Sequence, residues 1–125
     1  MSPSARRTLS WLLVALWAGV IFYASSRPGS TIPGGWSVQG HLSEYFVFGV
    51  LLAAALGEGR TTVRIALIAI AIASLYGVTD ELHQHFTHGR TPDPVDWATD
   101  TVGATVGAFA LLAWGRWRAR SRTSR

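Results

Sequence analysis

The chain has 125 residues, of which 49% are apolar and 14% charged, with a formal charge of +4 and no cysteine. This composition fits a small soluble domain or a compact membrane bundle, and it excludes disulfides, thiol redox chemistry and thiolate metal sites. The positive charge alone could suggest a nucleic-acid partner. The positions of the arginines have a topological explanation instead, so we expect no nucleic acid to bind.

Four apolar segments follow one another along the chain. The first and last reach the roughly 17 to 25 residues that span a bilayer, and the middle two do so only with their polar ends included. Residues 65–75 are apolar all round apart from Ser74, whereas a helix of a soluble bundle would carry a polar face. The sequence therefore predicts a single all-α domain over residues 1–125, a polytopic membrane helical bundle. The expected elements are transmembrane helices at about 8–25, 41–59, 64–85 and 95–115, and a basic tail at 116–125.

The first apolar segment also has the layout of a secretory signal peptide. Arg6 and Arg7 precede it, and the small residues 24–26 follow it. The segment is long for the apolar core of a signal peptide, however, and it contains Trp11 and Trp17. We expect an uncleaved anchor that completes an even number of helices, with cleavage as the alternative.

The eleven arginines are distributed unevenly. Nine of them lie before the first helix, between the second and third, or after the fourth. Arg27 and Arg90 lie in the other two loops, close to most of the acidic residues. The positive-inside rule therefore predicts that both termini are cytoplasmic and that the first and third loops face outward. The basic tail could also bind anionic lipid headgroups.

The loops carry clear local signals. Residues 25–40 are rich in Gly, Pro and Ser, which predicts an irregular loop, and the short loop at 57–62 predicts an antiparallel hairpin of the second and third helices. Asp93 is expected to cap the fourth helix, with Pro94 at its first position. Gly103 and Gly107 belong to a small-residue face that permits close helix packing.

Polar residues gather at the outer ends of the last three helices. They repeat at i, i+3 or i+4 within each helix, so those of one helix share a face or lie on adjacent faces. Exposing them to lipid would be costly, so we expect them to face the interior and to be protonated, paired with Arg90 or a histidine, or bound to a cation. The histidines at 83, 85 and 88 are expected at headgroup level. The candidates for an outward-facing pocket are His41, Glu44, Asp80, Glu81, Gln84, Arg90, Asp96 and Asp100.

The chemistry of such a pocket stays open at this point. The groups could only satisfy one another, with an arginine–aspartate clamp that fixes helix register. Carboxylates and a histidine could instead hold Mg²⁺, Mn²⁺ or Zn²⁺, although no HExxH or CxxC spacing is present, so the sequence requires no cofactor and leaves a divalent cation open. Arg90 suits a phosphate or carboxylate. Acid–base attack on a lipid-linked phosphate or glycan, or binding of such a group without reaction, are both consistent with these residues.

Several motifs of the chain resemble those of the VanZ-like family of small bacterial membrane proteins, over most of residues 41–107. The resemblance implies a multi-pass protein of the bacterial cytoplasmic membrane. The founding member is associated with low-level resistance to the glycopeptide teicoplanin, which implies an envelope role but no activity. Relatives often carry Asp-Lys before the histidine, where this chain has Val38-Gln39-Gly40, and Asn at the position of Asp100. The matching elements are His41-Leu-Ser-Glu44-Tyr45, Gly49, Tyr76-Gly77-Val-Thr-Asp80-Glu81-Leu-His-Gln84, Gly89-Arg90, Asp96, Asp100, Gly103-Ala104 and Gly107.

Three functional hypotheses follow. In the first, the pocket binds or modifies an envelope lipid or cell-wall precursor and changes sensitivity to glycopeptides or lipopeptides. In the second, the protein is a scaffold without catalytic activity that uses the glycine face and the basic tail to bind membrane partners or a second copy of itself. The third, an ion or proton pathway, is least favoured because the inner half of the bundle carries no buried ionisable residue.

Overall fold

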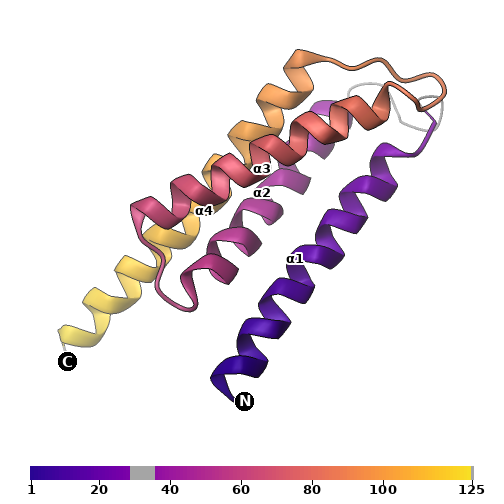
Figure 1. Ribbon diagram of the computed structural model, residues 1–125. Helices are drawn as coiled ribbons and strands as arrows, with labels where there is room; N and C mark the ends of the chain where they lie inside the picture. Colours follow the sequence, from indigo (N-terminus) through magenta and orange to yellow (C-terminus); the bar gives the residue numbers. More distant parts are fainter. Residues whose placement is uncertain (29–35, 125) are drawn as a thin grey trace.

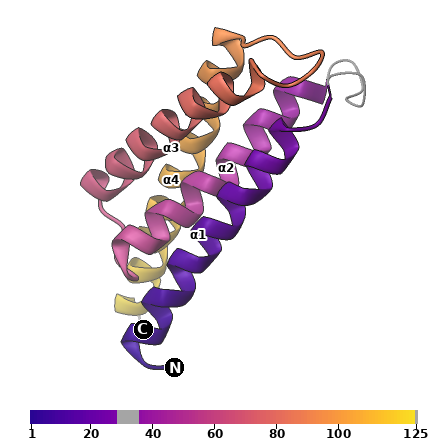
Figure 2. The ribbon, with the colours of Figure 1, turned by 45° about the vertical axis from the view of Figure 1, so that its right-hand side comes forward.

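The computed structural model describes residues 1–28 and 36–124. This part of the chain forms four helices and no strand, so the predicted all-α class is confirmed. The helices run up and down the bundle, and the N- and C-terminal ends lie at the same end of it (Figures 1 and 2). The helices are α1 (Pro3–Ser25), α2 (Trp36–Gly57), α3 (Val63–Gln84) and α4 (Pro94–Thr123).

Three helices are longer than the sequence predicted. Helix α1 begins at Pro3 rather than near residue 8, because the preceding serine caps it and proline suits the first turn. Helix α2 begins at Trp36 rather than near His41, because the four residues between them include no proline and a single glycine is tolerated within a helix. Helix α4 continues through the basic segment to Thr123, since arginine is a good helix former and positive charge is favourable at a helix C-terminus. Residues 29–35 of the predicted first loop lie outside the described residues.

The helix boundaries follow local chemistry. The side chain of Asp93 accepts a hydrogen bond from the backbone NH of Val95 at 2.8 Å, and Pro94 begins α4, as predicted. Thr62 caps α3 by accepting from the NH of Ile65 at 3.3 Å. Between α2 and α3 the chain turns at Gly59, whose φ of 97° favours glycine. The predicted hairpin of α2 and α3 is present.

The exposed surface of the bundle is strongly apolar. Helices α1, α2 and α3 are each long and apolar enough to cross a membrane. Helix α4 is not in this group, because Asp100 and several threonines and glycines interrupt its apolar run. Leu16, Leu75 and Val106 are more than half exposed, whereas several ionisable side chains are buried. Apolar residues outside and charged residues inside are the arrangement of a multi-pass membrane protein.

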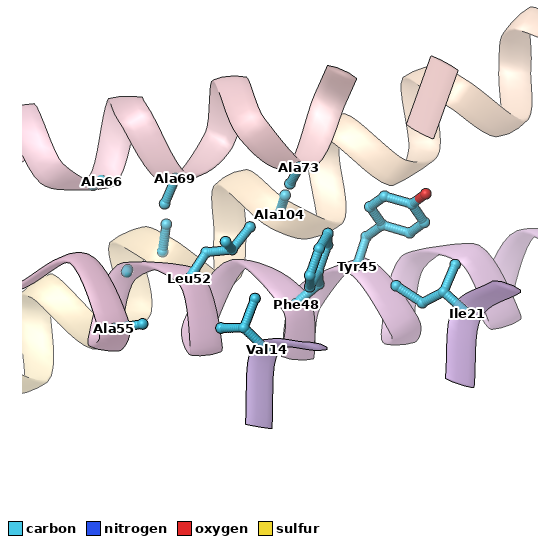
Figure 3. Close-up of a cluster of buried hydrophobic side chains, with 12 residues drawn as sticks. Val14, Ile21, Tyr45, Phe48, Leu52, Ala55, Ala66, Ala69, Ala73 and Ala104 are labelled. Carbon is cyan, nitrogen blue, oxygen red and sulfur yellow. The ribbon is translucent and has the colours of Figure 1, made fainter. Parts of the chain in front are cut away.

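The apolar core is thin and rich in small side chains (Figure 3). Ala66, Ala69 and Ala73 line the inner face of α3, which lets this helix approach α2 closely. Larger buried side chains from α1 and α2, among them Ile21, Tyr45 and Leu52, pack in the same core. Small side chains on α3 thus face larger ones on its neighbours, which allows the close packing found in protein interiors.

The most extensive contact joins α2 to α4, and glycines make it. A Cβ atom at Gly103 would lie 2.5 Å from the carbonyl oxygen of Leu42. A Cβ atom at Gly107 would lie still closer to the carbonyl oxygen of Phe46, and one at Gly49 still closer to that of Ala104. The predicted small-residue face therefore packs within the chain, so it is not a free surface for a partner.

Helix α1 is attached more loosely than the others. Within the described residues it packs against α2 and α3 but not against α4. The indole NH of Trp17 donates to the carbonyl of Glu44 at 2.9 Å, and the hydroxyl of Tyr76 donates to the carbonyl of Ala18 at 2.7 Å. Two side-chain hydrogen bonds thus fix the position of α1 along its neighbours.

Candidate functional site

The C-terminal end of α1, the N-terminal end of α2, the C-terminal end of α3 and the N-terminal end of α4 meet at one end of the bundle, the polar end (Figure 1). The opposite end holds both chain termini and is called the basic end. Each candidate residue predicted from the sequence lies at the polar end.

A histidine of α2 joins two carboxylates of α4. His41 Nδ1 lies 2.7 Å from Asp100 Oδ1, and His41 Nε2 lies 3.6 Å from Asp96 Oδ2. Asp100 has no exposed surface, and His41 is 6% exposed. The i, i+4 spacing of Asp96 and Asp100 places both carboxylates on the face that packs against α2. The predicted pairing of carboxylates with a histidine is therefore present.

Glu81 of α3 approaches the same histidine. Glu81 Oε2 accepts a hydrogen bond from the backbone NH of Asp93 at 2.8 Å. One ligand atom each of His41, Glu81 and Asp100 lies within 4.8 Å of the other two, and all three side chains are buried. Glu81 Oε1 and Asp100 Oδ2 are buried without a hydrogen-bond partner in the described part of the chain. Three helices thus converge on a small cluster with unused acceptor oxygens.

A second network lies between α1 and α3. Ser25 donates to Asp80 Oδ1, and Gln84 Nε2 lies 3.3 Å from Ser25 Oγ and 3.4 Å from Asp80 Oδ2. Gln84 Oε1 in turn accepts from Arg90 Nε at 3.2 Å. Asp80 and Gln84 are one turn apart on α3, so their side chains share a face, as predicted. Asp80 and His41 also interact electrostatically, which couples the two networks.

Two further polar side chains of α2 border these networks. Glu44 is half-buried and interacts electrostatically with His41 and Asp80. The hydroxyl of Tyr45, next to Glu44, is buried and has no hydrogen-bond partner among the described residues. Glu44 therefore belongs to the predicted group without a fixed contact of its carboxylate.

The remaining histidines lie at the edge of the polar end. His83 Nε2 lies 2.9 Å from Ser26 Oγ, and its ring stacks on Phe22 with centroids 4.3 Å apart. His85 and His88 are exposed. These positions agree with the expected peripheral place of the three histidines.

Arg90 does not form the clamp that was one of the alternatives for it. The sequence suggested a clamp between Arg90 and an aspartate, but among the described residues Arg90 forms no ion pair and bonds to the amide of Gln84 instead. Arg90 lies beside Gln84, and the buried aspartates have Ser25 and His41 as partners instead. The other guanidinium donors of Arg90 have no partner among the described residues, and they remain able to bind an anion.

Ser25 is the site residue that sequence reasoning missed. It was considered only as part of the small-residue end of the first segment. Its 4% exposure and its two contacts make it a member of the Asp80 network. The sequence did contain a signal, which was the expected depth of Ser25 in the membrane. A serine pair that ends the first apolar segment must lie at the same depth as the acidic ends of the other helices.

The chemical capacity of the site follows from its donors and acceptors. A buried histidine between carboxylates can move a proton, free carboxylate oxygens can bind a cation, and the guanidinium of Arg90 can bind an oxyanion. His41, Glu81 and Asp100 are the described residues that could hold a metal together.

The comparisons with known proteins give one match. The family model described as VanZ/LLP1 matches residues 10–115. No curated protein and no solved structure matches significantly.

Proposed function

The chain belongs to the VanZ/LLP1 family, and from this premise we propose that its polar end binds or chemically modifies an anionic lipid or a lipid-linked cell-wall precursor of the bacterial envelope. One observation carries the proposal. Polar and ionisable side chains of all four helices are buried together at one end of an otherwise apolar bundle. Burial of so many such groups is costly in a membrane protein and typically marks a functional site.

The proposed topology places this site outside the cytoplasm. We infer four transmembrane spans, with α4 crossing the membrane between Trp97 and Trp114, two residues suited to the interfaces. The positive-inside rule then puts the basic end, with both termini, in the cytoplasm and the polar end at the outer surface of the bacterial cytoplasmic membrane.

Arg90 is the residue proposed to recognise the ligand. It lies at the edge of the second network with one donor used by Gln84, so its other donors can reach a phosphate or carboxylate. The buried carboxylates and His41 lie behind it. They could transfer protons to a bound phosphate or glycan, or only orient it.

A scaffold function is less well supported. Gly103 and Gly107, which were expected to offer a partner surface, are covered by α2. A scaffold would have to rely on the basic end of the bundle or on the apolar surface.

The proposal is tested by teicoplanin susceptibility. A sensitive host would express wild type, Arg90→Ala or Arg27→Ala at membrane abundances matched by immunoblot. Arg27 is an exposed arginine at the same end and has no side-chain partner among the described residues, so Arg27→Ala is the matched control.

We expect wild type and Arg27→Ala to protect the host, and Arg90→Ala to protect it at least about tenfold less, the effect of losing about 1.4 kcal/mol of binding. Protection by Arg90→Ala equal to that of wild type would refute the role of the polar end. Absence of protection by wild type would refute the glycopeptide phenotype.

A further inference from the structure

The cluster of His41, Glu81 and Asp100 has features that internal pairing does not explain. Its three side chains come from α2, α3 and α4, and each is more than nine-tenths buried. Asp100 Oδ2 and Glu81 Oε1 both lack a hydrogen-bond partner within the described residues. Leaving two buried carboxylate oxygens unsatisfied is costly, so a ligand that satisfies both would be strongly favoured.

Each carboxylate is held by one oxygen and leaves the other free. The backbone NH of Asp93 fixes Glu81 through Oε2, and His41 fixes Asp100 through Oδ1. Fixing one oxygen by a hydrogen bond is how proteins orient the carboxylates that bind a metal. The arrangement therefore presents two free carboxylate oxygens beside an imidazole. On metal binding the imidazole would release the proton that it shares with Asp100, so that its nitrogen can become a ligand.

We propose that His41, Glu81 and Asp100 bind one divalent first-row transition-metal ion, such as Zn²⁺ or Mn²⁺. An imidazole nitrogen with two carboxylates suits these ions better than Mg²⁺ or Ca²⁺, which prefer oxygen ligands alone. The dipositive charge would also neutralise both carboxylates in the low-dielectric interior. This inference is independent of the proposed function.

The distances are compatible with such an ion. Ligand atoms around Zn²⁺ lie about 2.0–2.2 Å from the metal, and therefore roughly 3 to 4 Å from one another. The three ligand atoms here lie within 4.8 Å of one another, so small side-chain rotations would complete the site. Three protein ligands leave a coordination position for water or an anionic ligand.

The first test measures metal binding by the purified full-length protein in detergent, prepared with an affinity tag that contains no histidine. Metal content would be determined by mass spectrometry, and Co²⁺ binding would be followed by its visible absorption. Glu81→Gln and Asp100→Asn remove one ligand charge each at nearly constant shape. Glu58→Gln, in an exposed carboxylate at the basic end, is the control.

We expect wild type and Glu58→Gln to bind about one equivalent, and the two ligand variants to bind at least about a hundredfold more weakly, because even outer-shell changes cost ten- to a hundredfold. The site is refuted if wild type binds no metal, if both ligand variants bind like wild type, or if Glu58→Gln loses as much affinity as they do.

A second measurement does not depend on the ligand variants folding. In a protein with His83, His85 and His88 all changed to Gln, His41 is the one histidine left of the four in the sequence. Pulsed electron paramagnetic resonance of the Mn²⁺-loaded protein should then detect one coordinated imidazole nitrogen. A spectrum without nitrogen coupling would overturn the assignment.

Discussion

At the polar end of the bundle, His41, Asp80, Glu81 and Asp100 are buried and bonded to partners on other helices. At the basic end, Arg7 and Glu58 form an ion pair whose side chains are both more than half exposed. A cleft of about 930 Å³ also opens there. Its charged lining residues are Arg6, Arg60, Arg116, Arg118 and Arg122.

The difference lies in what each charge interacts with. Solvated charges at the basic end act mainly through their sign, which suits them for setting topology and for contact with anionic headgroups. Buried charges at the polar end need specific partners, so each of them constrains the positions of two helices. Loss of one charge should therefore have a large effect at the polar end and a small one at the basic end.

The largest effect is expected for His41→Ala. This change leaves Asp100 buried without its partner, and breaking a buried ion pair costs about 3–5 kcal/mol. The free energy of unfolding in detergent measures it. The double variant His41→Ala/Asp100→Ala should recover part of the loss, because it removes both partners. If the single variant lost less than about 1 kcal/mol of unfolding free energy, the buried charges of the polar end would matter no more than the solvated charges of the basic end.

A smaller effect is expected for Ser25→Ala. The change removes the hydroxyl that Asp80 and Gln84 share, and an unsatisfied buried polar group costs about 1–3 kcal/mol. Ser43→Ala is the control, since Ser43 is exposed, its hydroxyl contacts are to the backbone of its own helix, and its loss should cost less than about 0.5 kcal/mol. Thermal unfolding of both variants gives the comparison, and equal costs would show that burial at Ser25 carries no energetic weight.

The smallest effect is expected for Glu58→Gln. An exposed ion pair contributes less than about 1 kcal/mol, and salt screens it. The variant should therefore unfold within about 1 kcal/mol of wild type at low salt and closer still at high salt. A larger loss that persists in high salt would mean that the basic end also depends on specific pairing.

The sequence predicted the helices well because their signals are local. Apolar length is read from one continuous segment, and Pro94 and the capping Asp93 act within one turn of the helix start, where the structure has both in place. The starts of α1 and α2 and the end of α4 were less well predicted. There the helix continues beyond the apolar run, through residues that contain no proline inside the helix.

The sequence predicted which residues lie at the candidate site, but it did not predict which of them contact one another. Spacing placed Asp96 and Asp100 on one face, but whether that face meets His41 or Arg90 depends on how the helices rotate against one another. The glycine contacts of α2 and α4 determine that rotation. Ser25 was missed for the same reason, because its partner Asp80 is 55 residues away in the chain.

The glycine contacts have a consequence for the tolerance of the chain to substitution. Gly49, Gly103 and Gly107 have no room for a single methyl group, whereas an added Cβ at Gly40 or Gly115 would meet open space. Intolerance to substitution in this protein is therefore expected for two separate reasons. One is the chemistry of the polar end, and the other is the short distance between two backbones. Loss of function on substitution therefore indicates a reactive group only at positions where the neighbours could accommodate a larger side chain.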